Sequence, residues 1–186
     1  MARAVFLDRD GVLVRAHVRE GKPYAPLSLD QMELETDAQK SVARLRQSGL
    51  LSIVITNQPD VARGAVDRET VEAMHSKLLE FLALDGILAC YHDDSDECNC
   101  RKPKPGMLVD AASAFEINLG QSFMIGDRWR DIGAGMAAGC TTIWIDRGYD
   151  EPKGDGADYT VSSLSSAVLV IVALMNGNPH LARRYD

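Results

Sequence analysis

The sequence predicts an α/β fold, a three-layer, Rossmann-like, doubly wound parallel sheet covered by helices on both faces. Segments typical of strands alternate with segments typical of helices along the whole chain. The strand segments are continuous apolar runs, which is typical of parallel strands buried on both faces. The chain has 186 residues, enough for one domain with a sizeable core, so we expect a single domain over residues 1–186.

The strands and helices are expected in strict alternation. The five expected strands cover residues 4–8, 50–56, 87–91, 122–127 and 141–146. The five expected helices cover residues 36–49, 67–86, 105–118, 130–139 and 162–177.

Capping residues and glycines set the expected helix ends. Thr36 or Asp37 can cap the first helix, which Gly49 stops. Asp67 is the expected N-cap of the second helix, and Gly86 its expected end. Residues 14–35 are expected to be an irregular insert, 148–159 a polar surface loop, and 177–186 a frayed tail.

Composition excludes several classes of protein. The net charge is −7 and the pI is near 5.1, which gives no general attraction to nucleic acid or to an anionic membrane. The N-terminal apolar run is too short for a signal peptide, and no apolar run is long enough to span a bilayer. We therefore expect a cytoplasmic protein that binds neither nucleic acid nor membrane; the composition says nothing about oligomeric state.

Polar side chains gather at the carboxyl ends of the expected strands. Asp8 and Asp10 follow the first strand, Thr56 and Asn57 the second, and Asp127 the fourth. Ligands of open parallel sheets bind at this edge. Three carboxylates there suit Mg²⁺, which prefers oxygen ligands and lets a carboxylate approach a phosphate. Thr56 and Asn57 supply neutral donors to such a substrate, and Lys102 in "CRKPKPG" can offset phosphoryl charge.

Taken together, these motifs resemble those of the haloacid dehalogenase (HAD) superfamily of phosphohydrolases. "DRDG" matches its first motif, "VITN" its second, the Lys102 segment its third and "GDRWRD" its fourth. The resemblance covers residues 4–176. Many relatives carry Thr where this chain has Val12, which leaves the assignment unchanged.

The resemblance implies a role for each matched residue. Asp8 is expected to form an aspartyl-phosphate, and Asp10 to act first as general acid and then as general base. Thr56 and Lys102 would hold the phosphoryl group. Asp127 would bind Mg²⁺ together with Asp8 and the backbone carbonyl of Asp10. Asp131 would orient Lys102 or support the site from behind, with a plain helix-surface position as the alternative.

The segment "CYHDDSDECNC" contains four candidate metal ligands, Cys90, His92, Cys98 and Cys100. Cys-x-His and Cys-x-Cys pairs suit a tetrahedral Zn²⁺ site without an open position, so we expect a structural zinc loop over residues 90–100. A Cys98–Cys100 disulfide is less favoured in a reducing compartment. The loop would set Arg101 and Lys102, while Cys140 is expected to be a buried thiol.

This zinc loop resembles that of one superfamily branch, the D-glycero-D-manno-heptose 1,7-bisphosphate phosphatases and the histidinol-phosphate phosphatases. "TNQPDVARG" and "RKPKPGM" favour the heptose enzymes, whereas the short spacer between His92 and Cys98 favours the histidinol enzymes. Arg128 stands where heptose enzymes often have Lys. The resemblance implies removal of the 7-phosphate of the heptose bisphosphate, with histidinol phosphate or another small sugar phosphate as the alternative substrate.

Substrate contacts are expected from loops, because neither gap between the motifs is long enough for a folded cap domain. A capless fold leaves the site open. Arg101 and Arg63 are candidates to bind a second anionic group of the substrate, and Lys104 is a weaker one. Two other functions stay open: a zinc-stabilised module that binds nucleic acid through "CRKPK", and a regulatory domain phosphorylated on Asp8 that turns over slowly.

Overall fold

The computed structural model describes residues 1–182, and its centre is a six-stranded sheet in which every neighbouring pair of strands is parallel. In spatial order the strands are β5 (Gly86–Cys90), β4 (Leu51–Asn57), β1 (Ala4–Leu7), β6 (Phe123–Gly126), β7 (Thr141–Ile145) and β8 (Tyr159–Val161). This order, with β1 and β6 in the middle, confirms the predicted doubly wound sheet.

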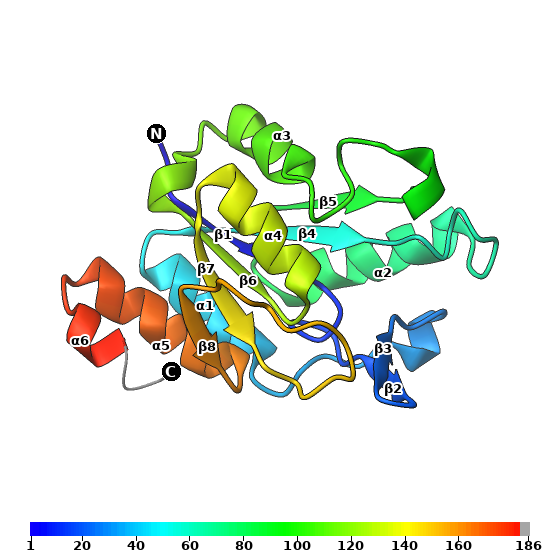
Figure 1. The fold of residues 1–186 in the computed structure, drawn as a ribbon, viewed down its shortest axis with the longest axis horizontal. Helices are drawn as coiled ribbons and strands as arrows, with labels where there is room; N and C mark the ends of the chain where they lie inside the picture. The colour runs from blue at the N-terminus through cyan, green and yellow to red at the C-terminus, as the bar shows by residue number, and fades with distance from the viewer. Residues whose placement is uncertain (183–186) are drawn as a thin grey trace.

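Helices cover both faces of the sheet (Figure 1). Helices α1 (Ala38–Gln47), α2 (Arg68–Phe81) and α5 (Leu164–Met175) contribute to the core on one face. Helices α3 (Gly106–Ala114) and α4 (Trp129–Ala138) contribute to the core on the other. Within β1, Val5 and Leu7 belong to the first core and Ala4 and Phe6 to the second, which explains why this strand is apolar without alternation.

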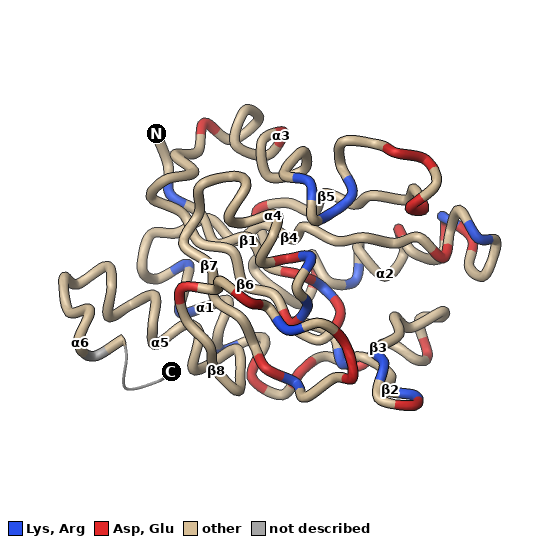
Figure 2. The backbone as a smooth tube through the Cα atoms, in the orientation of Figure 1, with Lys and Arg blue, Asp and Glu red and all other residues tan. Residues whose placement is uncertain are grey.

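The chain leaves the two central strands in opposite directions. After β1 it leads to α1 on one face, and after β6 it leads directly to α4 on the other. Such a switch point opens a crevice beyond the carboxyl ends of the two strands. Charged residues are frequent in the loops at this edge, whereas α5 is free of Lys, Arg, Asp and Glu (Figure 2).

The insert at 14–35 is more regular than expected. It contains a two-stranded hairpin, β2 (His17–Arg19) and β3 (Lys22–Tyr24), and a 3-10 turn over Leu29–Gln31. Glu20 and Gly21 both have positive φ, 49° and 73°, which matches the tight turn that suits a hairpin. Each strand has only three residues and β3 contains a proline, so no alternating pattern marked them.

Other boundaries also differ from expectation, and α3 ends at Ala114 rather than at residue 118. Helix α2 ends at Phe81 rather than at Gly86, because Leu82 becomes extended and is buried, and Gly86 instead begins β5. The loop at 148–159 is only partly a surface loop. Gly154 is buried in it against Trp144, and the loop leads into the short edge strand β8.

In the tail that begins at residue 177, a short helix, α6 (Pro179–Ala182), packs on α5 and buries Ala182. Residues 183–186, the rest of the tail for which fraying was expected, lie outside the described residues. Over residues 1–182, no helix is both long and apolar enough to cross a bilayer.

Candidate active site

The strand ends form one wall of a cavity of about 230 Å³ at the carboxyl edge of the sheet. The residues that line it include Asp8, Asp10, Asn57, Lys102 and Asp131. The first four were predicted from the sequence to belong to the site. Thr56 and Asp127 do not line this cavity: both are buried, and Asp127 lines a neighbouring cavity of about 250 Å³. The opposite wall comes from the β2–β3 hairpin, through Lys22 and Tyr24.

Lys102 lies at the centre of the site with its side chain only 2% exposed. Its Nζ lies 2.9 Å from Asp8 Oδ1 and 2.5 Å from Asp131 Oδ1, and donates to the carbonyl oxygen of Ile55 at 2.7 Å. Burial lowers the pKa of Lys102, but the charges of Asp131 and Asp8 outweigh it and raise the pKa above its ordinary value. Lys102 is therefore a fixed cation bridging two carboxylates, and Asp131 contacts it directly.

Asn57 holds the backbone of Lys102 in place. Its side-chain amide nitrogen donates to the carbonyl oxygen of Lys102 at 3.0 Å, and its amide oxygen accepts from the Lys102 N–H at 3.1 Å. These two bonds join the end of β4 to the segment that follows the Cys/His loop. Asn57 thereby determines where the ammonium group of Lys102 enters the site.

Asp127 is a buried carboxylate without compensation. Within the described part of the chain, neither of its side-chain oxygens has a hydrogen-bond partner of good geometry. Burial raises the pKa of Asp127 well above its ordinary value, the charges of Asp8 and Asp131 add to this, and the nearby Tyr149 hydroxyl only partly opposes it. A buried anion in this condition is costly, and a bound cation would compensate its charge.

The same conclusion follows from the charge of the cluster. The carboxylates of Asp8, Asp127 and Asp131 lie within 4.8 Å of one another, and Lys102 supplies the neighbouring positive charge. Burial raises the pKa of Asp8 to about 6, with Asp131 adding to the effect and Lys102 opposing it. Three carboxylates and one ammonium leave two negative charges, which one divalent cation would neutralise. The oxygen donors are those that Mg²⁺ prefers.

Gly11 allows the turn after β1 to pass close to Asp127. Its φ is +83°, and a Cβ atom at this position would lie 1.7 Å from Asp127 Oδ2. No other residue fits both the backbone conformation and the space. The glycine in "DRDG" is thus required by the approach of β1 and β6, the two central strands.

Asp10 is held by residues that no sequence pattern links to it. Arg9 is fully buried, and its guanidinium Nε lies 3.1 Å from both carboxylate oxygens of Asp10. Gln58 Nε2 donates to Asp10 Oδ2 at 2.8 Å. Arg9 Nη1 lies 3.2 Å from His75 Nε2, so the buried His75 side chain belongs to the same polar network. The sequence feature that could have pointed to a buried Arg9 is its place directly after an apolar strand, in "VFLDRDG".

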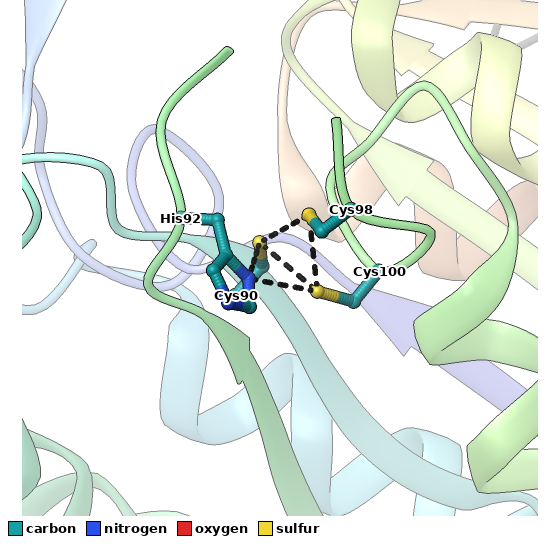
Figure 3. Close-up of side chains that lie close together, drawn as sticks. All are labelled: Cys90, His92, Cys98 and Cys100. Carbon is teal, nitrogen blue, oxygen red and sulfur yellow. Dashed lines mark hydrogen bonds between the residues drawn. The ribbon is translucent and has the colours of Figure 1, made fainter. Parts of the chain in front are cut away.

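The four predicted ligands of the Cys/His loop lie together (Figure 3). The Sγ and Nδ1 atoms of Cys90, His92, Cys98 and Cys100 are separated by 3.3–3.7 Å in the contacting pairs, and all four cysteines of the chain are free thiols. Ligands about 2.3 Å from a tetrahedral metal ion lie roughly 3.8 Å apart, close to this spacing. Partial burial raises the pKa of Cys98, but hydrogen bonds with Cys100 and neighbouring groups outweigh it and lower the pKa to about 7.

The three cationic residues that were predicted to bind the substrate differ in their positions relative to the cavity. Arg63 lines the cavity and pairs with Asp93, at 2.6 Å between Nη2 and Oδ1. Arg101 does not line it: its guanidinium binds Asp94 at 2.8 Å and the carbonyl oxygen of His92 at 3.2 Å, so its placement does not support substrate contact. Lys104 likewise donates to backbone carbonyls of the Cys/His loop.

Three other cations line the cavity and were not singled out for this role. They are Lys22 on the hairpin and two arginines at the start of α4, Arg128 and Arg130. Arg128 forms a two-pronged pair with Glu151, at 2.8 and 2.5 Å, and Arg130 pairs with Asp94 at 2.9 Å. The hairpin had no pattern that would have aimed Lys22 at the site.

Comparison with known proteins identifies relatives of this chain. A family model described as "HAD-hyrolase-like" matches residues 99–167. A D-glycero-beta-D-manno-heptose-1,7-bisphosphate 7-phosphatase from Pseudomonas aeruginosa is 35% identical over 154 residues, covering 80% of this chain and 84% of the relative. One from Pasteurella multocida is 31% identical over 188 residues, covering 94% and 99%.

A solved structure supports the same relationship. The crystal structure of D,D-heptose 1.7-bisphosphate phosphatase from B. bronchiseptica, complexed with magnesium and phosphate, has a TM-score of 0.78 and 29% identity to this chain. The match covers 92% of this chain and 99% of that one. From the shared fold and the sequence similarity along most of both lengths, we conclude that this chain is a phosphatase of the HAD superfamily and belongs to the family of the heptose-1,7-bisphosphate 7-phosphatases.

Proposed function

We propose that the protein removes the 7-phosphate of D-glycero-D-manno-heptose 1,7-bisphosphate through an aspartyl-phosphate on Asp8. The observation that carries this proposal is a buried cluster in which Asp8, Lys102 and Asp131 line the cavity and Asp127, whose oxygens have no hydrogen-bond partner among the described residues, lies beside them. The substrate is the one named for relatives that are 31–35% identical and cover most of the chain.

Asp8 is proposed as the nucleophile. The bonds from Lys102 Nζ and from the Arg9 N–H both reach Oδ1, at 2.9 and 2.8 Å, which leaves Oδ2 as the attacking oxygen. Attack forms the bond between Oδ2 and phosphorus and breaks the bond between phosphorus and the sugar oxygen. Lys102, with Thr56 as a neutral donor, would balance the charge that develops on the phosphoryl oxygens.

Asp10 is proposed as the general acid and base. It lines the cavity two residues after Asp8. In the first step it would give a proton to the departing sugar oxygen. In the second it would take a proton from the water that attacks the aspartyl-phosphate and releases inorganic phosphate. The presence of an acid here favours hydrolysis over a long-lived phosphorylated regulatory domain.

Asp8, Asp127 and the backbone carbonyl of Asp10 are the proposed ligands of Mg²⁺. The unpartnered oxygens of Asp127 and the excess negative charge fit such an ion. The chemistry that Mg²⁺ supplies when bound is neutralisation of phosphoryl charge, which allows a carboxylate to approach phosphorus.

Cys90, His92, Cys98 and Cys100 are the proposed ligands of a structural Zn²⁺. Four protein ligands leave no open position for catalysis. The loop would instead fix the segment that carries Lys102. Arg101 supports this role, because it binds Asp94 and the His92 carbonyl inside the loop.

A second anionic group of the substrate would meet the cations on the cavity rim. Lys22 is exposed on the hairpin, and Arg63, Arg128 and Arg130 each lie in the cavity wall beside a carboxylate partner. This charge suits a bisphosphate better than a substrate with one phosphate, such as histidinol phosphate.

With a net charge of −7, the protein as a whole would not attract nucleic acid, and we propose a cytoplasmic location.

A substrate panel tests the proposal. Phosphate release is measured for the heptose 1,7-bisphosphate, the heptose 7-phosphate and histidinol phosphate, with Mg²⁺ or with a chelator. We expect the bisphosphate to have the highest kcat/KM and the chelator to abolish turnover. Lys22→Met should raise KM for the bisphosphate more than for monophosphates, whereas Lys40→Met, the same change on the exposed face of α1, should not. Preferred turnover of histidinol phosphate would contradict the substrate assignment.

A further inference from the structure

Gln58 connects two parts of the proposed site, the segment that carries Asp10 and the end of β4 that carries Thr56. It is 2% exposed and directly follows β4. Its Nε2 donates to Asp10 Oδ2 at 2.8 Å and to Thr56 Oγ1 at 2.9 Å, so one amide group joins the proposed acid to the proposed phosphate donor. Its backbone N–H donates to the carbonyl oxygen of Cys90 at 2.7 Å, which anchors it to the end of β5.

The orientation of the Gln58 amide is fixed by its third partner. Oε1 accepts a hydrogen bond from Arg9 Nη2 at 2.9 Å. The opposite orientation would face Oε1 toward a carboxylate oxygen of Asp10 and leave the amide hydrogens against a guanidinium. Both consequences are unfavourable, so the amide has a single satisfactory orientation. The hydrogens of Nε2 are therefore directed to Asp10 and Thr56.

Arg9 supports this arrangement from behind. Its side chain is fully buried, and its Nε and Nη2 atoms contact Asp10 while Nη1 contacts the ring of His75. Burial and the charge of Arg9 hold the pKa of His75 at about 4, which leaves Nε2 free to accept from Arg9 at neutral pH. The side chains of Gln58, Arg9 and His75 thus all have hydrogen-bond partners, and hydrogen-bond networks of this kind are rigid.

Thr56 Oγ1 accepts from the same amide nitrogen and so helps to hold the Gln58 side chain in place. The same amide limits the directions in which the Asp10 carboxylate can face.

We propose that Gln58 is a positioning residue that acts through Asp10 and aims this acid at the leaving oxygen. This inference rests on the proposed function. It predicts a specific kinetic defect: protonation of the leaving group matters for a sugar or alkyl phosphate and matters little for p-nitrophenyl phosphate, whose leaving group is stable as an anion. A misplaced acid should therefore slow only the first class.

The test uses Gln58→Met, which keeps the length of the side chain and removes both donors. We expect kcat/KM for a sugar phosphate to fall about 10- to 100-fold, the effect of a misplaced catalytic group, and kcat/KM for p-nitrophenyl phosphate to fall much less. If this variant does not fold, Gln58→Glu, which keeps the acceptor for Arg9, replaces it. Thr142→Val, which removes a buried hydroxyl bonded to Asp158 away from the site, should slow both substrates equally or not at all.

A double-mutant cycle separates this inference from the function beneath it. In an Asp10→Asn background, Gln58→Met should cause little further loss for the sugar phosphate, because it acts through the group already removed. Equal losses for both substrate classes, or losses that multiply with Asp10→Asn, would overturn the positioning role. If Asp10→Asn does not slow the sugar phosphate more than p-nitrophenyl phosphate, the role of Asp10 fails first, and this proposal fails with it.

Discussion

His75 should make the stability of the protein depend on pH. Its ring is buried and its Nε2 faces Arg9 Nη1 at 3.2 Å, so protonation would place two positive charges in contact. Burial, followed by the charge of Arg9, lowers the pKa of His75 from 6.5 to about 4, although Glu72, at 3.6 Å from Nδ1, opposes this. The neutral ring is therefore the form that the folded state requires.

The direction and size of the effect follow from linkage. Between pH 6.5 and 4 the unfolded chain binds a proton at His75 and the folded chain does not. The stability that His75 contributes is complete above pH 6.5 and is lost as the pH falls towards 4. With these two pKa values the loss is about 2 kcal/mol at pH 5.

Chemical denaturation of the wild type and of His75→Gln at pH 7.5 and 5 measures this contribution. Gln keeps an acceptor for Arg9 but does not titrate, so the comparison cancels the acid sensitivity of the metal-binding groups. We expect the difference in unfolding free energy between the two proteins to shift by about 2 kcal/mol against the wild type at pH 5. A difference that is the same at both pH values would refute the buried, neutral state of His75.

Other expectations concern the two metal sites and the nucleophile. Asp127→Asn should abolish stabilisation by Mg²⁺ yet raise the Tm of metal-free protein, because it removes a buried charge without a partner; a lower metal-free Tm would contradict this. Cys98→Ser should reduce zinc content, measured by metal analysis, and lower the Tm by disrupting the four-ligand loop; a wild type without zinc would refute that reading. Asp8→Asn should abolish turnover while circular dichroism shows the native fold; near-normal activity would exclude Asp8 as the nucleophile.

The fold was largely predictable because apolar runs and polar strand ends are local properties of the sequence. Parallel strands bring their carboxyl ends to one edge, so the sequence alone predicts that Asp8, Asn57 and Lys102 lie at one cavity. The Cys/His loop was equally accessible, since its ligands are close in sequence. Weak local signals, such as the three-residue strands of the hairpin, were missed.

Side-chain direction was the part that the sequence could not supply. Arg101 and Lys102 are adjacent, yet Lys102 points to the carboxylates of the site and Arg101 to Asp94 in the Cys/His loop. Arg9, Gln58 and His75 come from three separate segments, and only the packing of α2 beside the strand ends brings them together. Their contacts depend on tertiary structure and leave no periodic pattern.

Detection of the covalent intermediate tests the account most directly. Asp10→Asn is mixed with p-nitrophenyl phosphate labelled at phosphorus and with Mg²⁺, quenched in acid and mapped by mass spectrometry; the good leaving group lets the aspartyl-phosphate form, and the missing base lets it accumulate. The account predicts one phosphoryl group on Asp8, absent with a chelator or in Asp8→Asn. A phosphoryl group on another residue, or turnover by this variant without any phosphoprotein, would contradict it.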